Sequence, residues 1–384
     1  MYQTLLWKRI KYLLEPVWVF RPSIRLMVIV GGLIFVSMVF IGSTFLDDVL
    51  LGIKIRSSTF QESESGAVES PSFGSNLVWN DGIDHKVNEN NGKVSVIHFW
   101  SSACATCRDA YGRLAEWQYK YNKYGVRVYG IYSPQFDFEV DDPKQYEDAI
   151  NKYGMKRYPV AIDFNFELTD AFVKASDSFN SSGSVIVIID KKGFIRHTII
   201  DANNLPNGEL VIQALLTEAK VKHRFPLPVR QARIKGKITT NLYFNNEDTT
   251  STEKFVAKEK LKNGEQIYTL EEGLLDGQWS LGGTWSRNKS SIQAIKNGIL
   301  GTRITGKRVF IVVGSAYAED YLGVVIDRES GVYRPPEVDK DGVLKITNSG
   351  IYQIISAKKT LNKKDLKLSV PDKLKIYQLI VLPN

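Results

Sequence analysis

The sequence contains few of the residues that bind metals or form structural disulfides in small folds. Its 384 residues include two cysteines, four histidines and four methionines. So few cysteines exclude a disulfide-stapled scaffold. A zinc site within one chain needs at least two ligands beyond the cysteine pair, and the histidines show no paired spacing. We expect no metal and no cofactor, with a site of four sulfurs shared between two chains as the alternative.

Two other patterns are missing as well. The formal net charge is +8, but no cluster of basic and aromatic residues accompanies it, which excludes the usual nucleic-acid-binding surface. No pair of carboxylates stands out as the acid and base of a glycoside hydrolase. The charge is also uneven, because residues 1–25 carry five basic residues against one acid.

The first fifty residues predict a membrane anchor. After the basic leader 1–25, residues 26–46 read "LMVIVGGLIFVSMVFIGSTFL" without a charge. About 20 apolar residues suffice to cross a bilayer, and the basic leader favours a cytoplasmic N-terminus. We therefore expect a single-pass protein of the inner membrane with its bulk in the periplasm. A cleaved signal peptide is the alternative, although its apolar region would be shorter.

Residues 47–76 are polar and rich in serine and glutamate, which is typical of a flexible linker. The alternative, for the last third of this stretch, is a first strand or cap of the next domain.

Residues 77–222 alternate between strand-like and helix-like segments, which predicts an α/β domain with a central sheet. The strands are expected in "VSVIHFWS" (94–101), "VRVYGIYS" (126–133), "YPVAID" (158–163), "SVIVIID" (184–190) and "FIRHTII" (194–200). Helices are expected after Cys107 and in 142–154, 167–175 and 207–220.

Both cysteines lie in "VIHFWSSACATCRD" (96–109), where a strand passes into a helix. Free amides and the positive end of the helix dipole favour the thiolate at that position. Cys104 is therefore the candidate nucleophile that attacks a disulfide, and Cys107, one turn further on, is the candidate that resolves the mixed disulfide. A bridge that is permanently oxidised is the alternative. The Pro and Thr that a peroxidase pattern requires before its cysteine are missing.

The motif "FWSSACATC" resembles the thioredoxin fold in its membrane-anchored TlpA-like branch, and "SPQFDFE…YPVAID" resembles DipZ-type proteins. The resemblance implies a redox disulfide between Cys104 and Cys107 and protein thiols or disulfides as substrates. It also implies electrons from a membrane thiol transporter of the CcdA or DsbD kind.

Two positions depart from the family pattern. His98 replaces the usual buried acid, so it either accepts the proton of the resolving cysteine or is simply a packed histidine bonded to a carbonyl. Ser184 stands where the family has a proline, normally cis, and we expect a trans peptide there because a non-proline cis bond costs about 2.5–4 kcal/mol. Either substrate choice has shifted or redox activity has weakened. With His98, Trp100 is expected to shape the site.

Residues 223–384 contain short alternating segments separated by Gly, Asn and Asp, which predicts an all-β sandwich or jelly roll. The stretch 274–314 resembles the C-terminal domain of DipZ-type proteins, which is similar to carbohydrate-binding modules. Trp279 and Trp285 are candidate glycan-binding residues, with a place in the core as the alternative.

The sequence thus predicts a thioredoxin fold followed by an all-β jelly-roll or sandwich domain, with one N-terminal transmembrane helix. The predicted function is a membrane-anchored, extracytoplasmic thiol–disulfide oxidoreductase that reduces protein disulfides. The alternative is a non-catalytic envelope scaffold whose β-domain binds glycan or protein.

Overall fold

The computed structural model describes residues 68–74, 76–85, 92–142, 144–175, 183–200, 205–225, 228, 239–315, 317, 319–326, 332–333 and 335–383. The chain divides into residues 1–58 and a compact unit of residues 59–384, and every described residue belongs to the second unit. None of the helices described there is long and apolar enough to cross a membrane. The leader 1–25 and the predicted span 26–46 lie outside the described residues.

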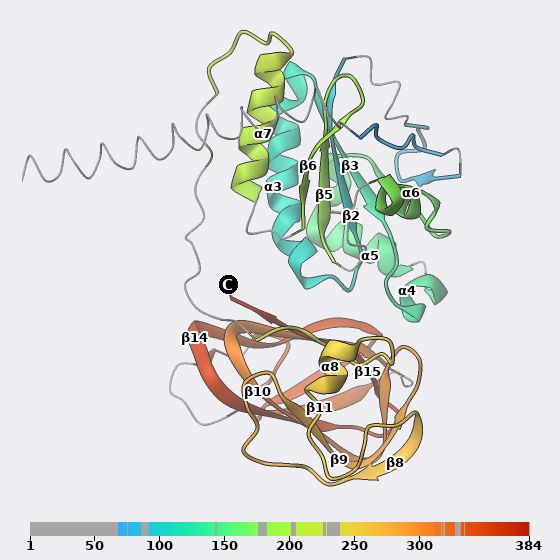
Figure 1. Cartoon of the computed structure of the whole chain (residues 1–384), viewed down its shortest axis with the longest axis vertical. Helices are drawn as coiled ribbons and strands as arrows, with labels where there is room; N and C mark the ends of the chain where they lie inside the picture. Colours follow the sequence, from blue (N-terminus) through green and yellow to red (C-terminus); the bar gives the residue numbers. More distant parts are fainter. Residues whose placement is uncertain are drawn as a thin grey trace, which may run out of the picture. The chain divides into compact units, whose positions relative to one another are not determined.

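A six-stranded mixed sheet is the centre of the α/β domain, residues 68–225 (Figure 1). Its order is β1-β4-β3-β2-β5-β6, in which β2, β3 and β4 are parallel and the remaining neighbours antiparallel. All seven residues of β2 are buried, as expected for an apolar central strand. The strands are β1 (Val78–Trp79), β2 (Val94–Trp100), β3 (Val126–Tyr132), β4 (Val160–Ile162), β5 (Val185–Ile189) and β6 (Ile195–Ile199).

Helices cover both faces of this sheet. They are α3 (Ala105–Tyr121), α4 (Asp137–Asp141), α5 (Lys144–Tyr153), α6 (Glu167–Ala175) and α7 (Leu205–Glu218). In Figure 1, α3 and α7 lie on one face and α6 on the other. Gly208 permits the close approach of α7, because a Cβ atom there would lie 2.4 Å from the Cδ1 of Ile199.

The end of the predicted linker belongs to the α/β domain. The amide of Ser70 donates to the carbonyl of Gly193, and the amide of Ile195 donates to the carbonyl of Val68. Phe73 is buried against Trp79 and Tyr129. This part of residues 47–76 therefore follows the alternative prediction, because its apolar side chain completes the core under the sheet.

The β-domain, residues 239–383, has one connected antiparallel sheet and a single short helix among its described residues. Its sheet path is β13-β11-β14-β10-β15-β7, with β12 paired to β14, β9 to β10, and β8 to β9. The elements are β7 (Leu242–Tyr243), α8 (Thr249–Glu253), β8 (Gly264–Tyr268), β9 (Trp279–Arg287), β10 (Ile292–Gly314), β11 (Asp320–Ile326), β12 (Val332–Tyr333), β13 (Val343–Ile346), β14 (Gly350–Val370) and β15 (Lys375–Leu382).

Short strands were predicted for this region, and for β10 and β14 that prediction is wrong. The two strands are 23 and 21 residues long and pair with each other along most of their length. The charged stretch 358–367 conceals the continuity of β14 in the sequence, because most of its side chains are exposed and few apolar residues mark the strand.

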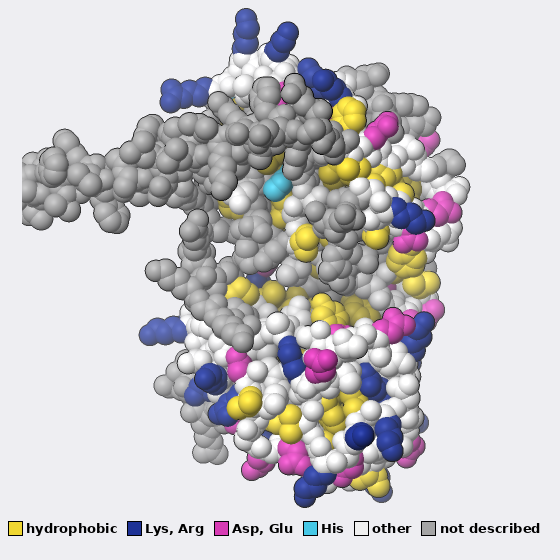
Figure 2. Space-filling model, in the orientation of Figure 1, with side chains coloured by type: hydrophobic (Ala, Val, Ile, Leu, Met, Phe, Trp, Pro, Cys, Tyr) yellow, Lys and Arg dark blue, Asp and Glu magenta, His cyan; other side chains and the backbone are white. Residues whose placement is uncertain are grey.

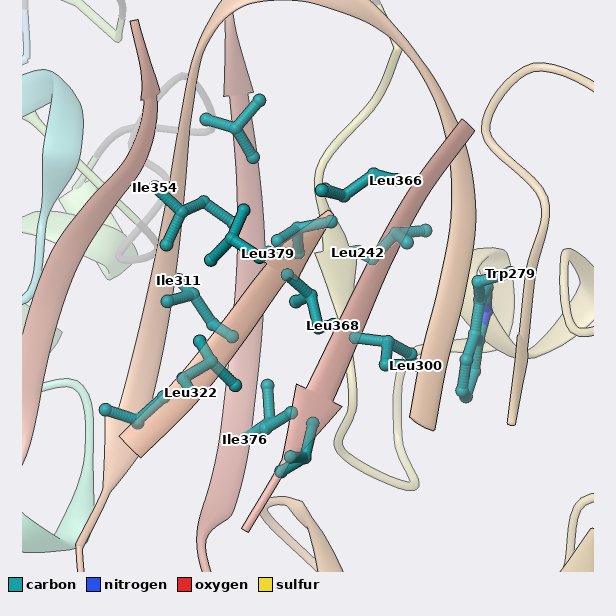
Figure 3. Packing of buried hydrophobic residues seen from close by; sticks show 14 of the residues in the cluster. Leu242, Trp279, Leu300, Ile311, Leu322, Ile354, Leu366, Leu368, Ile376 and Leu379 are labelled. Atoms are coloured by element: carbon teal, nitrogen blue, oxygen red, sulfur yellow. The ribbon is translucent and has the colours of Figure 1, made fainter. Parts of the chain in front are cut away.

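The last part of β10 is apolar on both of its faces. Val309, Ile311 and Val313 lie in the core of the β-domain, which Figure 3 shows around Ile311. The alternate residues Phe310 and Val312 lie in a second apolar cluster with Ala103 and Ala105 of the α/β domain. The period of two in a strand thus directs one set of side chains inward and the other set to the neighbouring domain.

Charged side chains of both signs are interspersed on the face shown in Figure 2. No large patch of basic side chains is seen among the described residues of that face.

Candidate active site

The cysteine pair lies at the carboxyl end of β2. Cys104 is the N-cap of α3 and has an extended backbone, and Cys107 follows in the first turn. The two form a disulfide in this structure, and the amide of Cys107 donates to the Sγ of Cys104 at 3.1 Å. Cys107 is fully buried, whereas Cys104 retains 4% of its surface. A partner sulfur can therefore approach Cys104 more readily than Cys107.

Glu139 holds the loop before the cysteine pair. Its carboxylate is 1% exposed, and Oε1 accepts from the amide of Ser102 at 2.8 Å, from the Ser102 hydroxyl at 2.6 Å and from the amide of Ala103 at 3.2 Å. Tyr132 donates to the same oxygen, and Oε2 accepts from the amides of Gln135 and Phe136. A buried carboxylate is tolerated when donors satisfy its oxygens, as they do here.

Sequence reasoning missed Glu139 as a site residue. It stands in α4, 35 residues after Cys104, and the only signal was its place in the block "SPQFDFE". A single acid in a short segment does not reveal by itself which backbone amides it will meet.

His98 is fully buried, and its Nε2 lies 3.1 Å from the hydroxyl of Ser184. Burial lowers the pKa of His98 to about 3, so the imidazole is neutral at ordinary pH. A base with so low a pKa is poorly matched to accepting a cysteine proton near neutrality. The packed alternative is the better supported one, although its observed partner is a hydroxyl and not a backbone carbonyl.

Trp100 is 1% exposed at the end of β2, among three tyrosines. Ring centroids lie 5.6 Å away for Tyr111, 4.9 Å for Tyr132 and 6.3 Å for Tyr146. The aromatic cluster fixes the end of the strand from which the cysteine loop departs. Burial also raises the pKa of Tyr132 and of Tyr146, so both phenols stay protonated.

Ser184 directly precedes β5 and lines the same cavity as Cys104. No cis peptide bond occurs among the described residues, so the bond before Ser184 is trans, as expected. The structure thus brings together Cys104, Cys107, His98 and Ser184 around one end of the sheet.

Trp279 and Trp285 do not belong to a binding site, and this prediction is corrected. Each indole is 1% exposed in the β-domain core, and Figure 3 shows Trp279 beside that core. Their Nε1 atoms donate to the carbonyls of Ser251 and Gly282. Neither ring offers a face to a sugar, because both are covered by other side chains.

The described part of the chain contains no group of three or more His, Cys, Asp or Glu residues placed to hold a metal ion. The cysteine pair, placed where a strand passes into a helix, can carry out thiol–disulfide chemistry of the thioredoxin type.

Comparisons with known proteins agree with this class. Residues 69–198 match the AhpC/TSA family, and residues 239–379 match the family described as thioredoxin like C-terminal domain. DipZ of Mycobacterium tuberculosis is 23% identical over 228 residues, 58% of this chain and 31% of DipZ. The thiol-disulfide oxidoreductase YkuV of Bacillus subtilis is 25% identical over 128 residues, 33% of this chain and 80% of YkuV. The two matched regions and these relatives support a thioredoxin-family protein of the DipZ/TlpA type, in the class of thiol–disulfide oxidoreductases.

The matched region spans about a third of the length of DipZ. Among solved structures, a thiol:disulfide interchange protein of the thioredoxin family from Chlorobium tepidum is 20% identical, with a TM-score of 0.34. The similarity covers 40% of this chain and 99% of that protein.

Proposed function

We propose that the protein reduces disulfides of other proteins, with Cys104 as the nucleophile and Cys107 as the resolving cysteine. The observation that supports this assignment is that the two cysteines differ in their position on the helix and in their burial. The N-cap position and a hydrogen bond from the Cys107 amide favour a thiolate on Cys104, and Cys107 is buried beside it.

The reaction balances in two exchanges. The Cys104 thiolate attacks one sulfur of the substrate disulfide; that bond breaks, the other substrate sulfur leaves as a thiolate, and a mixed disulfide forms. The thiolate of Cys107 then attacks the Sγ of Cys104 and releases the second substrate thiolate. Two electrons pass to the substrate, two protons follow from solvent, and the enzyme keeps the Cys104–Cys107 disulfide. A membrane-bound dithiol donor of the CcdA or DsbD kind regenerates the reduced pair.

The setting of this activity is part of the proposal. Residues 26–46 anchor the chain in the inner membrane, the N-terminus is cytoplasmic, and the catalytic part lies in the periplasm. The apolar run and the basic leader support this arrangement. Because the chain has only two cysteines, labelling of the reduced protein in intact cells with a membrane-impermeant thiol reagent tests it directly; lack of labelling until the inner membrane is opened would contradict it.

The activity is tested by redox titration of the full-length chain against glutathione and dithiothreitol. A reversible two-electron couple near about −270 mV supports a reductase, whereas one near about −120 mV indicates an oxidant. Cys107→Ser should trap a mixed disulfide on Cys104, and Cys104→Ser should trap none. A bridge that cannot be reduced reversibly would leave the envelope scaffold as the function.

A further inference from the structure

The nucleophile lies in a cavity that has a second wall from the β-domain. The cavity has a volume of about 500 Å³, and Cys104, Thr106 and Ser184 line one side of it. Strands β7 and β15 and their flanking residues supply the other side, namely Asn241, Tyr243, Asn245, Gln378 and Ile380. Tyr243 and Gln378 are partners in the antiparallel register of these two strands. A substrate that enters this cavity therefore lies beside the β-domain.

Two further strands of the β-domain, β10 and β14, contact the first turns of α3. Arg308 donates to both carboxylate oxygens of Asp109, at 3.1 and 2.6 Å. Arg108, next to Cys107, donates to the carbonyl of Ile351 at 3.1 Å. Ala103 and Ala105 pack into one apolar cluster with Phe310 and its neighbours. Polar and apolar contacts thus join the β-domain to residues on both sides of the cysteine pair.

The residues that line the cavity favour an uncharged substrate over an anionic one. Among the described residues that line the cavity, Asp170 is the only charged one, and none is basic. Two asparagines and two glutamines offer amide groups that can both donate to and accept from a peptide backbone. Phe136, Ile200 and Ile380 add apolar surface for uncharged side chains. An anionic thiol such as glutathione finds no cation here and meets a carboxylate.

The size of the cavity favours an extended segment of a substrate over a folded domain. A volume of about 500 Å³ is within the range of about 300–1,000 Å³ that small ligands fill, and it is far too small for a folded domain. An extended segment, whose backbone groups are unpaired before binding, can use the amides of the wall.

We propose that the substrate cysteine is presented by an extended, uncharged polypeptide segment, and that the β-domain is the specificity wall of the thiol site. This inference rests on the proposed function. It gives the β-domain a role in substrate choice, in place of glycan binding through its tryptophans.

The test measures the rate at which the reduced full-length chain reduces three disulfides. The probes are a linear peptide dimer with neutral residues around its cysteine, the same peptide with glutamates at those positions, and glutathione disulfide. The neutral peptide should react at least about tenfold faster than either anionic probe, a factor that corresponds to 1.4 kcal/mol.

Two variants of the wall complete the experiment. Tyr243→Ala and Gln378→Ala should each slow the neutral peptide about tenfold while leaving the redox potential and the reduction of the pair by dithiothreitol unchanged. Tyr321→Ala is the matched control, because this tyrosine is 54% exposed on another strand of the β-domain and does not line the cavity.

The outcomes separate the two proposals. Equal rates for neutral and acidic peptides, or wall variants that behave like Tyr321→Ala, overturn the specificity wall while the oxidoreductase stands. Slowing with dithiothreitol as well would also overturn it, since that result indicates damage to the cysteine pair. If the wild-type chain reduces none of the probes, the proposed function itself falls. The comparison of peptides in the wild-type chain keeps the test decisive if a variant does not fold.

Discussion

The imidazole of His98 and the hydroxyl of Ser184 form a buried pair 3.1 Å apart, although 86 positions separate them in the sequence. Burial lowers the pKa of His98 to about 3, against 6.5 for an unperturbed histidine. Between these values the unfolded chain binds a proton that the folded chain does not. The contribution of neutral His98 to the free energy of unfolding is therefore complete above about pH 6.5, and it is lost progressively as the pH falls toward 3.

The first prediction follows from this pair. The free energy of unfolding should fall with decreasing pH between 6.5 and 3, with a contribution from His98 of up to about 1.4 kcal/mol per pH unit. His98→Asn should flatten this dependence in denaturant titrations. An unchanged slope in His98→Asn would show that the buried imidazole does not cause it.

Glu139 should be important for stability out of proportion to its size. Removing its carboxylate leaves backbone amides before Cys104 and before α4, one buried and three partly buried, without an acceptor. Glu139→Ala should lower the free energy of unfolding by about 3 kcal/mol or more, since each hydrogen bond to a charged group contributes about 1.5–3 kcal/mol. Glu147→Ala, at an exposed position of α5, should change it by less than about 0.5 kcal/mol. Similar losses in the two variants would contradict the assigned role.

The ion pair between Asp109 and Arg308 should couple the two domains. Their side chains are 37% and 22% exposed, so a double-mutant cycle with alanine should give a coupling free energy of at most about 1 kcal/mol, weakened by salt. The more exposed pair Glu272–Lys367 serves as the control and should give less. If both cycles give the same coupling, the bidentate contact contributes nothing special at this interface.

Trp279 should act as a core residue and not as a sugar platform. Trp279→Ala should cost about 3–5 kcal/mol of unfolding free energy, as expected when a large buried aromatic side chain is removed. Trp279→Phe loses the bond to the Ser251 carbonyl but keeps most of the ring, and the domain should still fold. Any glycan retained by the wild-type chain on an affinity column should be retained equally by Trp279→Phe, and specific loss of retention would restore the binding role.

Local patterns in the sequence were sufficient to predict the α/β domain. The apolar run of β2, the helical spacing after Cys107 and the position of the cysteine pair between them are all properties of neighbouring residues. The acceptor for the Ser102 amide lies 37 positions away, and the partner of His98 lies 86 positions away. No short pattern reveals such contacts, because they depend on which loops the sheet brings together. For the same reason, the sequence did not reveal that β7 and β15 form one wall of the cavity.

The doubly apolar end of β10 has a consequence for solubility. Phe310 and Val312, with Tyr377, Ile380 and Leu382 of β15, are covered by the α/β domain in the intact chain. Cleavage between residues 226 and 238 followed by separation would leave a strip of apolar side chains on the released β-domain open to water. The released fragment would expose these apolar side chains and tend to self-associate. The solubility of the β-domain therefore depends on its contact with the α/β domain.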